Sequence, residues 1–297
     1  MHPEVIELTA GSARLHVWPQ VGGALVAWRR GDVALLRPVS LEMMGERNAR
    51  RLAAFPLVPF SNRIAWGRFA FMGRDYAIRR NTPDHRHPIH GNAWESAWTV
   101  DARAADAIAL HFSHHAAGAA AEAWPFSYRA ESHIALTDDR LQVILAIENT
   151  GQWPMPAGLG LHPFFPATPE TELGFAADSV WLNDPANLPA ERVGPPARWC
   201  CTPPRRIAGM SVDNCFNGWA GRADIRWPGR AALTIEADPP LRHLVVYVPD
   251  ERPYFAVEPV SHMNDGINHM QEPDAGIRVL APGERLAATI RFTAGPG

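Results

Sequence analysis

Apolar and polar residues alternate along much of the chain with a period of two, which is typical of half-buried β-strands. Between residues 126 and 136, aromatic and aliphatic side chains fall on one face, and Ser, Arg, Glu and His fall on the other. The alternation resumes from Leu141 to Ile147, and the intervening Thr-Asp-Asp at 137–139 is typical of a turn. We therefore predict a β-hairpin here.

Strand patterns of the same kind recur throughout, whereas the best helical candidate, Met43 to Ala54, is short and ends against Pro56. The other predicted strands cover residues 13–17, 69–72, 76–78, 108–112, 231–235, 244–248, 254–260 and 286–292. The 28 prolines and 23 glycines separate these short segments. The pattern predicts an all-β fold, an antiparallel sandwich or barrel. The Pro-rich stretch 184–204 is interpreted as a long surface loop, so residues 1–297 form one domain.

Composition and charge exclude several classes of protein. The net charge is −3 and the pI is about 6.5, which argues against nucleic acid as a partner. All 28 basic residues are arginine, so Schiff-base chemistry and a phosphate-binding-loop lysine are excluded. The segment MHPEVIELTA lacks the features of a signal peptide, and no stretch has the length of a membrane span. We expect a soluble cytoplasmic protein, no membrane association and three reduced cysteines.

Three ionisable residues occur in apolar surroundings and are candidates for acid–base chemistry. Glu258 follows the apolar strand pattern beginning at Tyr254, and a buried strand rarely holds a carboxylate without a reason. His90 in HPIHGNAW and His162 in GLGLHPFF are flanked by apolar residues and glycine. A buried carboxyl has a raised pKa, and an imidazole titrates near neutral pH, so the three supply a base and two candidate acids.

Each candidate also has a purely structural interpretation. Glu258 could pair with a neighbouring arginine, and a histidine on an apolar strand is often a satisfied core residue. His85, His87 and His90 have the spacing HxHxxH, which resembles a metal site, but the segment is interpreted as a loop in which no carboxylate or cysteine completes the ligand set. We therefore expect no metal here.

Six segments in order resemble the aldose 1-epimerase, or galactose mutarotase, family. They are FPLVPFSNRIAWGRF (55–69), HPIHG (87–91), GLHPFF (160–165), VDNCF (212–216), VEPVSHMNDGIN (257–268) and LAPGE (280–284). Each motif alone is weak, but six in register are specific. The resemblance implies a large antiparallel β-sandwich of the galactose mutarotase-like supersandwich type, in agreement with the period-two pattern.

The resemblance further implies a cofactor-independent isomerase that interconverts the α and β anomers of an aldose. Carried over by motif, Glu258 is the base and His162 is the acid at the ring oxygen, while His90 stabilises the open-chain form. Arg63 and Asp213 hold sugar hydroxyls, with Asn62 as a helper, although Arg63 could be a surface charge and Asp213 could cap a turn with Asn214. The activity should follow a bell-shaped pH profile with a plateau near neutrality.

Two other functions stay open from the sequence. One is a hexose 6-phosphate mutarotase, for which Arg79, Arg80 and Arg86 could form a cationic pocket or merely a solvated edge. The other is a non-catalytic sugar-binding protein on the same fold. The motifs His90-Gly91-Asn92 and Leu161-His162-Pro163 differ from those of the longer galactose-specific members, so the resemblance does not extend to galactose as the substrate.

Overall fold

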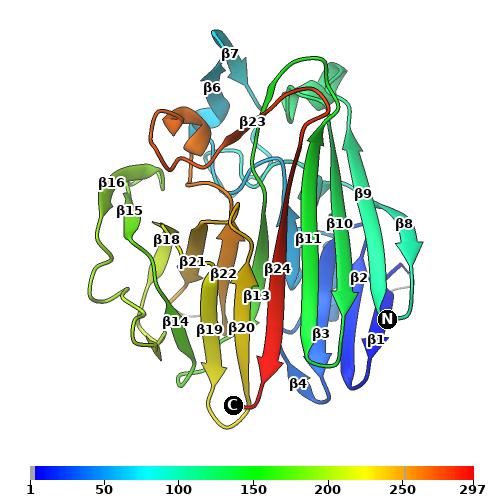
Figure 1. Cartoon of the computed structure of the whole chain (residues 1–297), viewed down its shortest axis with the longest axis vertical. Helices are drawn as coiled ribbons and strands as arrows, with labels where there is room; N and C mark the ends of the chain where they lie inside the picture. Colours follow the sequence, from blue (N-terminus) through cyan, green and yellow to red (C-terminus); the bar gives the residue numbers. More distant parts are fainter. Residues whose placement is uncertain (1–3, 251) are drawn as a thin grey trace.

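Two large antiparallel sheets face each other in the computed structural model, which describes residues 4–250 and 252–297 (Figure 1). The larger sheet has 11 strands, in the order β1-β2-β3-β5-β13-β22-β21-β18-β15-β16, with β4 paired to β3. Its strands are β1 Ile6–Ala10, β2 Ala13–Trp18, β3 Ala24–Arg30, β4 Val33–Ala34, β5 Ala54–Leu57, β13 Gly160–Pro166, β15 Ser179–Asn183, β16 Pro189–Val193, β18 Val212–Asn217, β21 His243–Val248 and β22 Tyr254–Val260.

The second sheet has nine strands, in the order β17-β14-β19-β20-β24-β11-β10-β9-β8. These strands are β8 Thr99–Arg103, β9 Ala107–His114, β10 Tyr128–Leu136, β11 Arg140–Asn149, β14 Glu172–Phe175, β17 Arg205–Arg206, β19 Arg222–Trp227, β20 Ala231–Ala237 and β24 Arg285–Gly295. Two small two-stranded sheets lie beyond them at the upper end in Figure 1: β6 Arg68–Phe71 with β7 Arg74–Ala77, and β12 Met155–Ala157 with β23 Arg278–Leu280.

The alternation along the strands of the larger sheet explains its two buried faces. In β13, Leu161 and Phe165 belong to the main core between the sheets, where Phe165 lies 6.4 Å from Phe292 of β24, centroid to centroid. Phe164 points to the opposite face, where it joins a second apolar cluster with Phe55. This second face carries the candidate site, so the apolar sandwich forms a rigid support beneath it.

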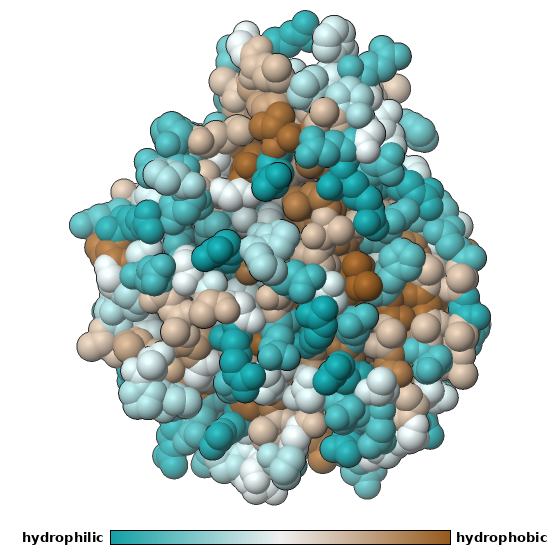
Figure 2. Space-filling view, in the orientation of Figure 1, coloured by the Kyte–Doolittle hydropathy of each residue, from teal (hydrophilic) through white to brown (hydrophobic). Residues whose placement is uncertain are grey.

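Helical structure is confined to short segments. They are α1 Leu41–Gly45 and the 3₁₀ turns η1 Ala49–Arg51, η2 Ala65–Gly67, η3 Ala93–Glu95, η4 Gly118–Glu122 and η5 Gly266–His269. In residues 4–250 and 252–297, no helix has the length and apolar character needed to cross a membrane. Hydrophilic residues cover much of the face in Figure 2, with apolar residues in small groups between them.

The predicted all-β antiparallel sandwich is confirmed. The hairpin predicted around 137–139 is formed by β10 and β11, with Leu136 opposite Leu141. Each of the other predicted segments coincides with a strand. One local prediction was wrong: the supposed loop 184–204 contains β16, an edge strand paired with β15. The best helical candidate, Met43 to Ala54, is not a single helix, because the end of α1 and then η1 fall within it with a break between them.

Candidate active site

The strand register brings His162 and Glu258 together at the middle of the larger sheet. In β13 and β22, Gly160 pairs with Val260 and Phe164 pairs with Ala256, so His162 lies opposite Glu258. On the other side of β13, His162 pairs with Phe55 of β5. Directly opposed residues share a face of the sheet, so all three side chains project to the face away from the main core.

His162 and Glu258 form a buried pair in close contact. The imidazole Nε2 lies 3.2 Å from Glu258 Oε1, and the side chains are 10% and 2% exposed. His162 Nδ1 and Glu258 Oε2 are buried without a partner among the described residues. The pair therefore fits neither the satisfied core histidine nor the arginine-paired glutamate that the sequence left open.

Burial shifts the two groups in opposite directions, and both shifts favour the uncharged forms. Desolvation raises the pKa of Glu258 well above its usual range, with a further increase from Asp213 and opposition from Arg63. Desolvation likewise lowers the pKa of His162 well below its usual value, helped by the positive charge of Arg37 and Arg50. The uncharged forms of the two groups together hold one titratable proton, and their titrations belong to the pair.

His90 reaches the same place from a loop held against the ends of the strands. Its ring centroid lies 5.3 Å from that of His162, nearly perpendicular to it. His90 Nδ1 accepts a hydrogen bond from the Asn62 amide at 3.1 Å, while the His90 amide donates to the Asn62 carbonyl at 2.8 Å. Because Nδ1 is an acceptor, the neutral ring carries its proton on Nε2. Burial, with the neighbouring His162 and Arg50, lowers the pKa of His90 well below its usual value, so it is a neutral donor.

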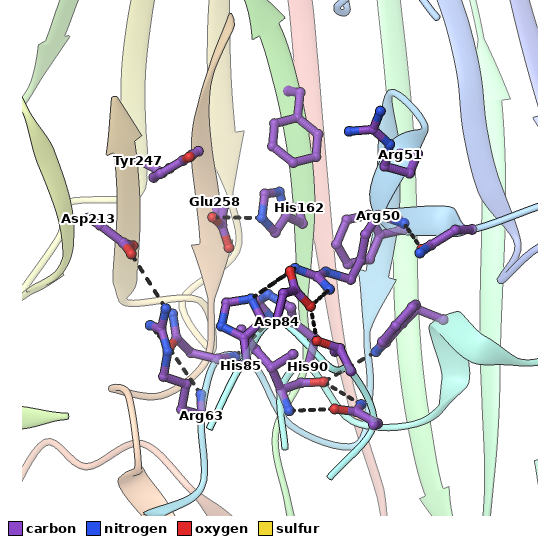
Figure 3. Close-up of a pocket in the computed structure, with 18 of the residues that line it drawn as sticks. Arg50, Arg51, Arg63, Asp84, His85, His90, His162, Asp213, Tyr247 and Glu258 are labelled. Carbon is purple, nitrogen blue, oxygen red and sulfur yellow. Dashed lines mark hydrogen bonds and ion pairs between the residues drawn. The ribbon is translucent and has the colours of Figure 1, made fainter. Parts of the chain in front are cut away.

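Arg63 and Asp213 form a second polar pair beside the first (Figure 3). Arg63 Nη2 lies 3.5 Å from Asp213 Oδ2, and the side chains are 7% and 39% exposed. Asn62 Oδ1 accepts from both the amide and Nη1 of Arg63 at 3.0 Å, so the role of Asn62 in the structure is to orient this guanidinium. Asp213 lies within β18 and not in a turn, which removes the capping interpretation.

These residues line one cavity of about 560 Å³, a size typical of small-molecule sites. All six residues predicted from the sequence, Glu258, His162, His90, Arg63, Asp213 and Asn62, line it. Trp94 also lines the cavity. Arg79, Arg80 and Arg86 are outside its lining, and Arg79 pairs with Glu95 at 3.3 Å.

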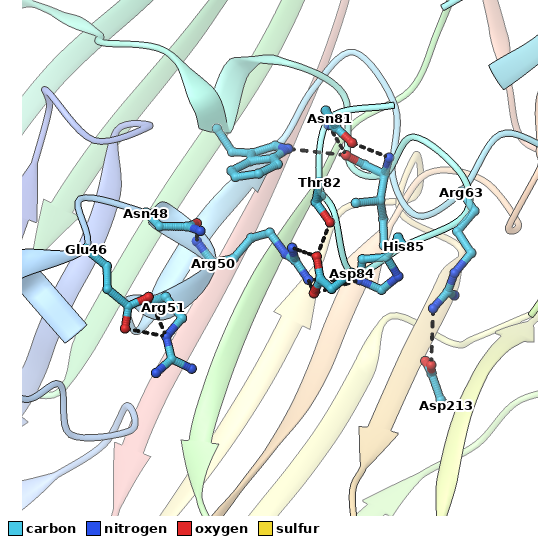
Figure 4. Close-up of polar contacts among 12 residues, drawn as sticks. Glu46, Asn48, Arg50, Arg51, Arg63, Asn81, Thr82, Asp84, His85 and Asp213 are labelled. Atoms are coloured by element: carbon cyan, nitrogen blue, oxygen red, sulfur yellow. Dashed lines mark hydrogen bonds and ion pairs between the residues drawn. The ribbon is translucent and has the colours of Figure 1, made fainter. Parts of the chain in front are cut away.

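One wall of the cavity is a loop fixed by a network that the sequence did not predict (Figure 4). Arg50 donates from both terminal nitrogens to the Asp84 carboxylate at 3.0 Å, and Thr82 donates to the same carboxylate. Arg50 also lies 2.8 Å from His85 Nε2. Desolvation and the charge of Arg50 lower the pKa of His85 to about 4, so its ring is neutral and Nε2 accepts this hydrogen bond.

The histidines of HxHxxH are engaged with separate partners. His85 contacts Arg50, while His87 accepts from the Trp66 amide through Nδ1 and lies 3.1 Å from the Ala186 carbonyl through Nε2. His90 holds the Asn62 amide. Within residues 4–250 and 252–297, no three His, Cys, Asp or Glu side chains are grouped as a metal site.

Two other residues of the cavity lining could have been predicted from the sequence. Phe164 is two residues from His162, and Tyr254 is four residues from Glu258, so strand alternation alone puts each on the face of the site. By contrast, nothing in the sequence relates Arg37, Arg50 and Asp84 to Glu258, because only the folded chain brings these distant segments together.

The comparisons with known proteins agree with this fold and cavity. The family model for aldose 1-epimerase matches residues 4–293. An Escherichia coli K12 relative, the uncharacterized protein YphB, is 31% identical across 96% of this chain and 97% of its own. The crystal structure of a putative aldose 1-epimerase from Escherichia coli K12 is 29% identical, covers 99% of both chains and has a TM-score of 0.89. Galactose 1-epimerase from Lactobacillus acidophilus shares the fold at 14% identity, with a TM-score of 0.79 over 99% of this chain and 95% of that one.

The sandwich and its polar cavity define a carbohydrate-epimerase type of protein. The chain belongs to the aldose 1-epimerase family.

Proposed function

We propose that the protein is a mutarotase that interconverts the α and β anomers of an aldose by opening and reclosing the sugar ring, without a cofactor. The observation that carries this proposal is the buried His162–Glu258 pair, 3.2 Å apart, in the lining of a cavity of sugar size. Membership of the aldose 1-epimerase family supports the reaction class.

In the proposed reaction, each group of the pair moves one proton. The ionised Glu258 carboxylate takes the proton from the anomeric hydroxyl O1, while the His162 imidazolium gives a proton to the ring oxygen. The bond between C1 and the ring oxygen breaks, and C1 and O1 become an aldehyde. Glu258 is then protonated and His162 neutral, so the pair keeps zero net charge. Rotation about the C1–C2 bond and reversal of both transfers produce the other anomer.

The burial of the pair supports this cycle. Its two one-proton forms, the ion pair and the neutral pair, are the forms before and after ring opening. Burial favours the neutral pair, as the directions of the pKa shifts of Glu258 and His162 indicate. The neutral pair is the form present after ring opening, so the buried site stabilises that state more than water would. No net charge has to enter or leave the site.

The neighbouring residues have positioning roles in the proposal. His90, a neutral Nε2–H donor, stabilises the developing oxygen charge of the open form. The Arg63 guanidinium donates to adjacent sugar hydroxyls and the Asp213 carboxylate accepts from them, since both ends of this pair line the cavity. Asn62 keeps Arg63 oriented.

The decisive experiment follows the optical rotation of freshly dissolved pure anomers of several aldoses, with and without the protein. Faster decay to equilibrium with the wild type, and decay at the spontaneous rate with folded Glu258→Gln, would support the proposal. Saturable sugar binding by calorimetry, with no acceleration for any sugar, would instead support the sugar-binding alternative.

A further inference from the structure

The cavity is rich in positive charge, although the whole chain has a net charge of −3. Five arginines line it, against three carboxylates that include Glu258. Asp84 is bound to Arg50, and Asp213 is bound to Arg63. The remaining arginines, Arg37, Arg51 and Arg252, have no carboxylate partner within the cavity lining.

Arg37 is the least expected of these three cations, because it is only 4% exposed. Its guanidinium carbon lies 3.7 Å from the centroid of Phe164 and 4.6 Å from that of Tyr254. Nη2 donates to the carbonyls of Arg50 and Leu52, whereas Nε is buried without a partner among the described residues. Burial lowers its pKa to about 10, so it is still a cation at neutral pH.

A buried cation without an acid is normally unfavourable, so its presence in a ligand cavity requires an explanation. The two aromatic rings and two carbonyls hold the guanidinium in place but leave its charge without a counter-ion. A fixed guanidinium of this kind is suited to a carboxylate or phosphate, with which it forms short charge-assisted hydrogen bonds.

Arg51 and Arg252 add exposed positive charge to the same cavity. The Arg51 side chain is 43% exposed, and it contacts Glu46, which is 41% exposed and outside the cavity lining. Such exposed pairs are weak, so Arg51 can exchange this partner for a ligand. Arg252 is exposed and has no ion pair within the described part of the chain. In Figure 3, Arg51 and Arg63 lie on opposite sides of His162.

We propose that the substrate is an aldose with an anionic group, a carboxylate or a phosphate monoester, at the end remote from its anomeric carbon, and that Arg37, Arg51 and Arg252 bind this group. The inference rests on the proposed function, because His162 and Glu258 must hold the anomeric end. Arg63 and Asp213 then hold hydroxyls on one side of the pair, and the anionic group extends to the other.

The test compares glucose, glucuronate and glucose 6-phosphate by exchange NMR, which measures anomer interconversion at equilibrium for all three sugars. We expect kcat/KM for at least one anionic sugar to exceed that for glucose by about tenfold or more, as one or two charge-assisted hydrogen bonds provide. Added salt should reduce this advantage but leave the glucose rate unchanged. The two anionic sugars distinguish a carboxylate subsite from a phosphate subsite.

Variants then connect the preference to the three arginines. Arg252→Ala and Arg37→Met should each lower the ratio of kcat/KM for the preferred anionic sugar to that for glucose by about tenfold. Arg80→Ala is the matched control, because Arg80 is an exposed arginine outside the cavity lining, and it should leave the ratio unchanged. If Arg37→Met fails to fold, Arg252→Ala carries the test alone, since its side chain is exposed.

The outcomes separate the two proposals. Acceleration of all three sugars with similar kcat/KM, or a ratio that Arg252→Ala does not change, would overturn the anionic subsite while the mutarotase proposal stands. Interconversion of every sugar at the spontaneous rate would overturn the mutarotase proposal and the inference that rests on it.

Discussion

His162 Nε2 lies 3.2 Å from Glu258 Oε1 across two adjacent strands at the middle of an 11-stranded sheet. Because neighbouring strands of a packed sandwich hold their side chains at fixed spacing, the distance between the proposed base and the proposed acid is set by the register of β13 and β22. Loops close the cavity around the pair, but the pair itself is part of the rigid sheet, which suits a reaction that needs two proton transfers at one small ring.

Glu258→Gln should abolish the acceleration of anomer exchange and leave the fold intact. The amide has the shape of the carboxylic acid but cannot accept the proton of O1, and removal of a general base typically lowers the rate by about 10²–10⁴-fold. Polarimetry measures the rate, and circular dichroism with thermal unfolding checks the fold. A folded variant with a rate near that of the wild type would show that Glu258 is not the base.

His162→Asn should lower kcat more than it weakens sugar binding, because its proton is needed mainly when the ring bond stretches. Calorimetry on the variant gives the sugar affinity independently of the rate. His90→Asn serves as the comparison, since His90 lines the same cavity but forms no ion pair with Glu258 among the described residues. An effect of His162→Asn confined to binding would assign His162 as a contact residue only.

The fold was predictable from the sequence wherever one face of a strand is buried. The strong alternation of β10, β11 and β24 reflects strands in which buried residues largely alternate with half-buried or exposed ones. β16 was not predicted because Pro189–Val193 is an edge strand without a buried residue, so its sequence lacks the alternating apolar positions. Met43 to Ala54 was only a weak helical candidate, and the structure agrees that no long helix forms there, since α1 has no buried residue to stabilise one.

The candidate site was predictable where a charge interrupts an apolar segment. Glu258 and His162 stood out in this way, and the motifs supplied Arg63, Asp213 and Asn62. Arg37 was not predictable, because one arginine among 28 basic residues carries no sign of its burial. Its environment is created by Phe164 and Tyr254, which are distant in sequence and adjacent only after the sheet has formed.

Gly91→Ala should destabilise the protein and also reduce activity, because Gly91 fixes the loop that carries His90. Gly91 has a φ of +72°, and an added Cβ would collide with the Val58 carbonyl oxygen. Gly73→Ala is the matched control, since Gly73 has a φ of +73° with no atom within 4 Å of an added Cβ.

Both glycine variants carry the backbone strain of a left-handed residue, about 1–2 kcal/mol, so any additional loss in Gly91→Ala measures the close approach to Val58, the residue after β5. Chemical denaturation gives the free energy of unfolding, and polarimetry gives the rate. Equal destabilisation of the two variants, with full activity in both, would contradict a role for this contact in positioning His90.

The last prediction concerns pH and follows from the proton that His162 and Glu258 share. In the proposed mechanism, activity requires one proton in the pair: with two there is no base, and with none there is no acid. Burial disfavours both charged states, so it lowers the pKa of His162 and raises that of Glu258. The rate should therefore rise with pH through a value well below the usual 6.5 of histidine, and fall through a value well above the usual 4.5 of glutamate.

In the simplest expectation, ionisation of the carboxyl sets the acid limb of the pH profile and deprotonation of the imidazole sets the alkaline limb. The directions of the two pKa shifts change this expectation. In the wild type both limbs belong to the pair, with a plateau around neutral pH. In His162→Asn the pair is gone, and the remaining activity needs ionised Glu258 alone, whose pKa is raised by burial. The alkaline limb should then disappear, and the acid limb should move to higher pH.

The pH profiles of kcat/KM for the wild type, His162→Asn and His90→Asn test this directly. An alkaline limb that persists in His162→Asn and is lost in His90→Asn would exchange the roles of the two histidines.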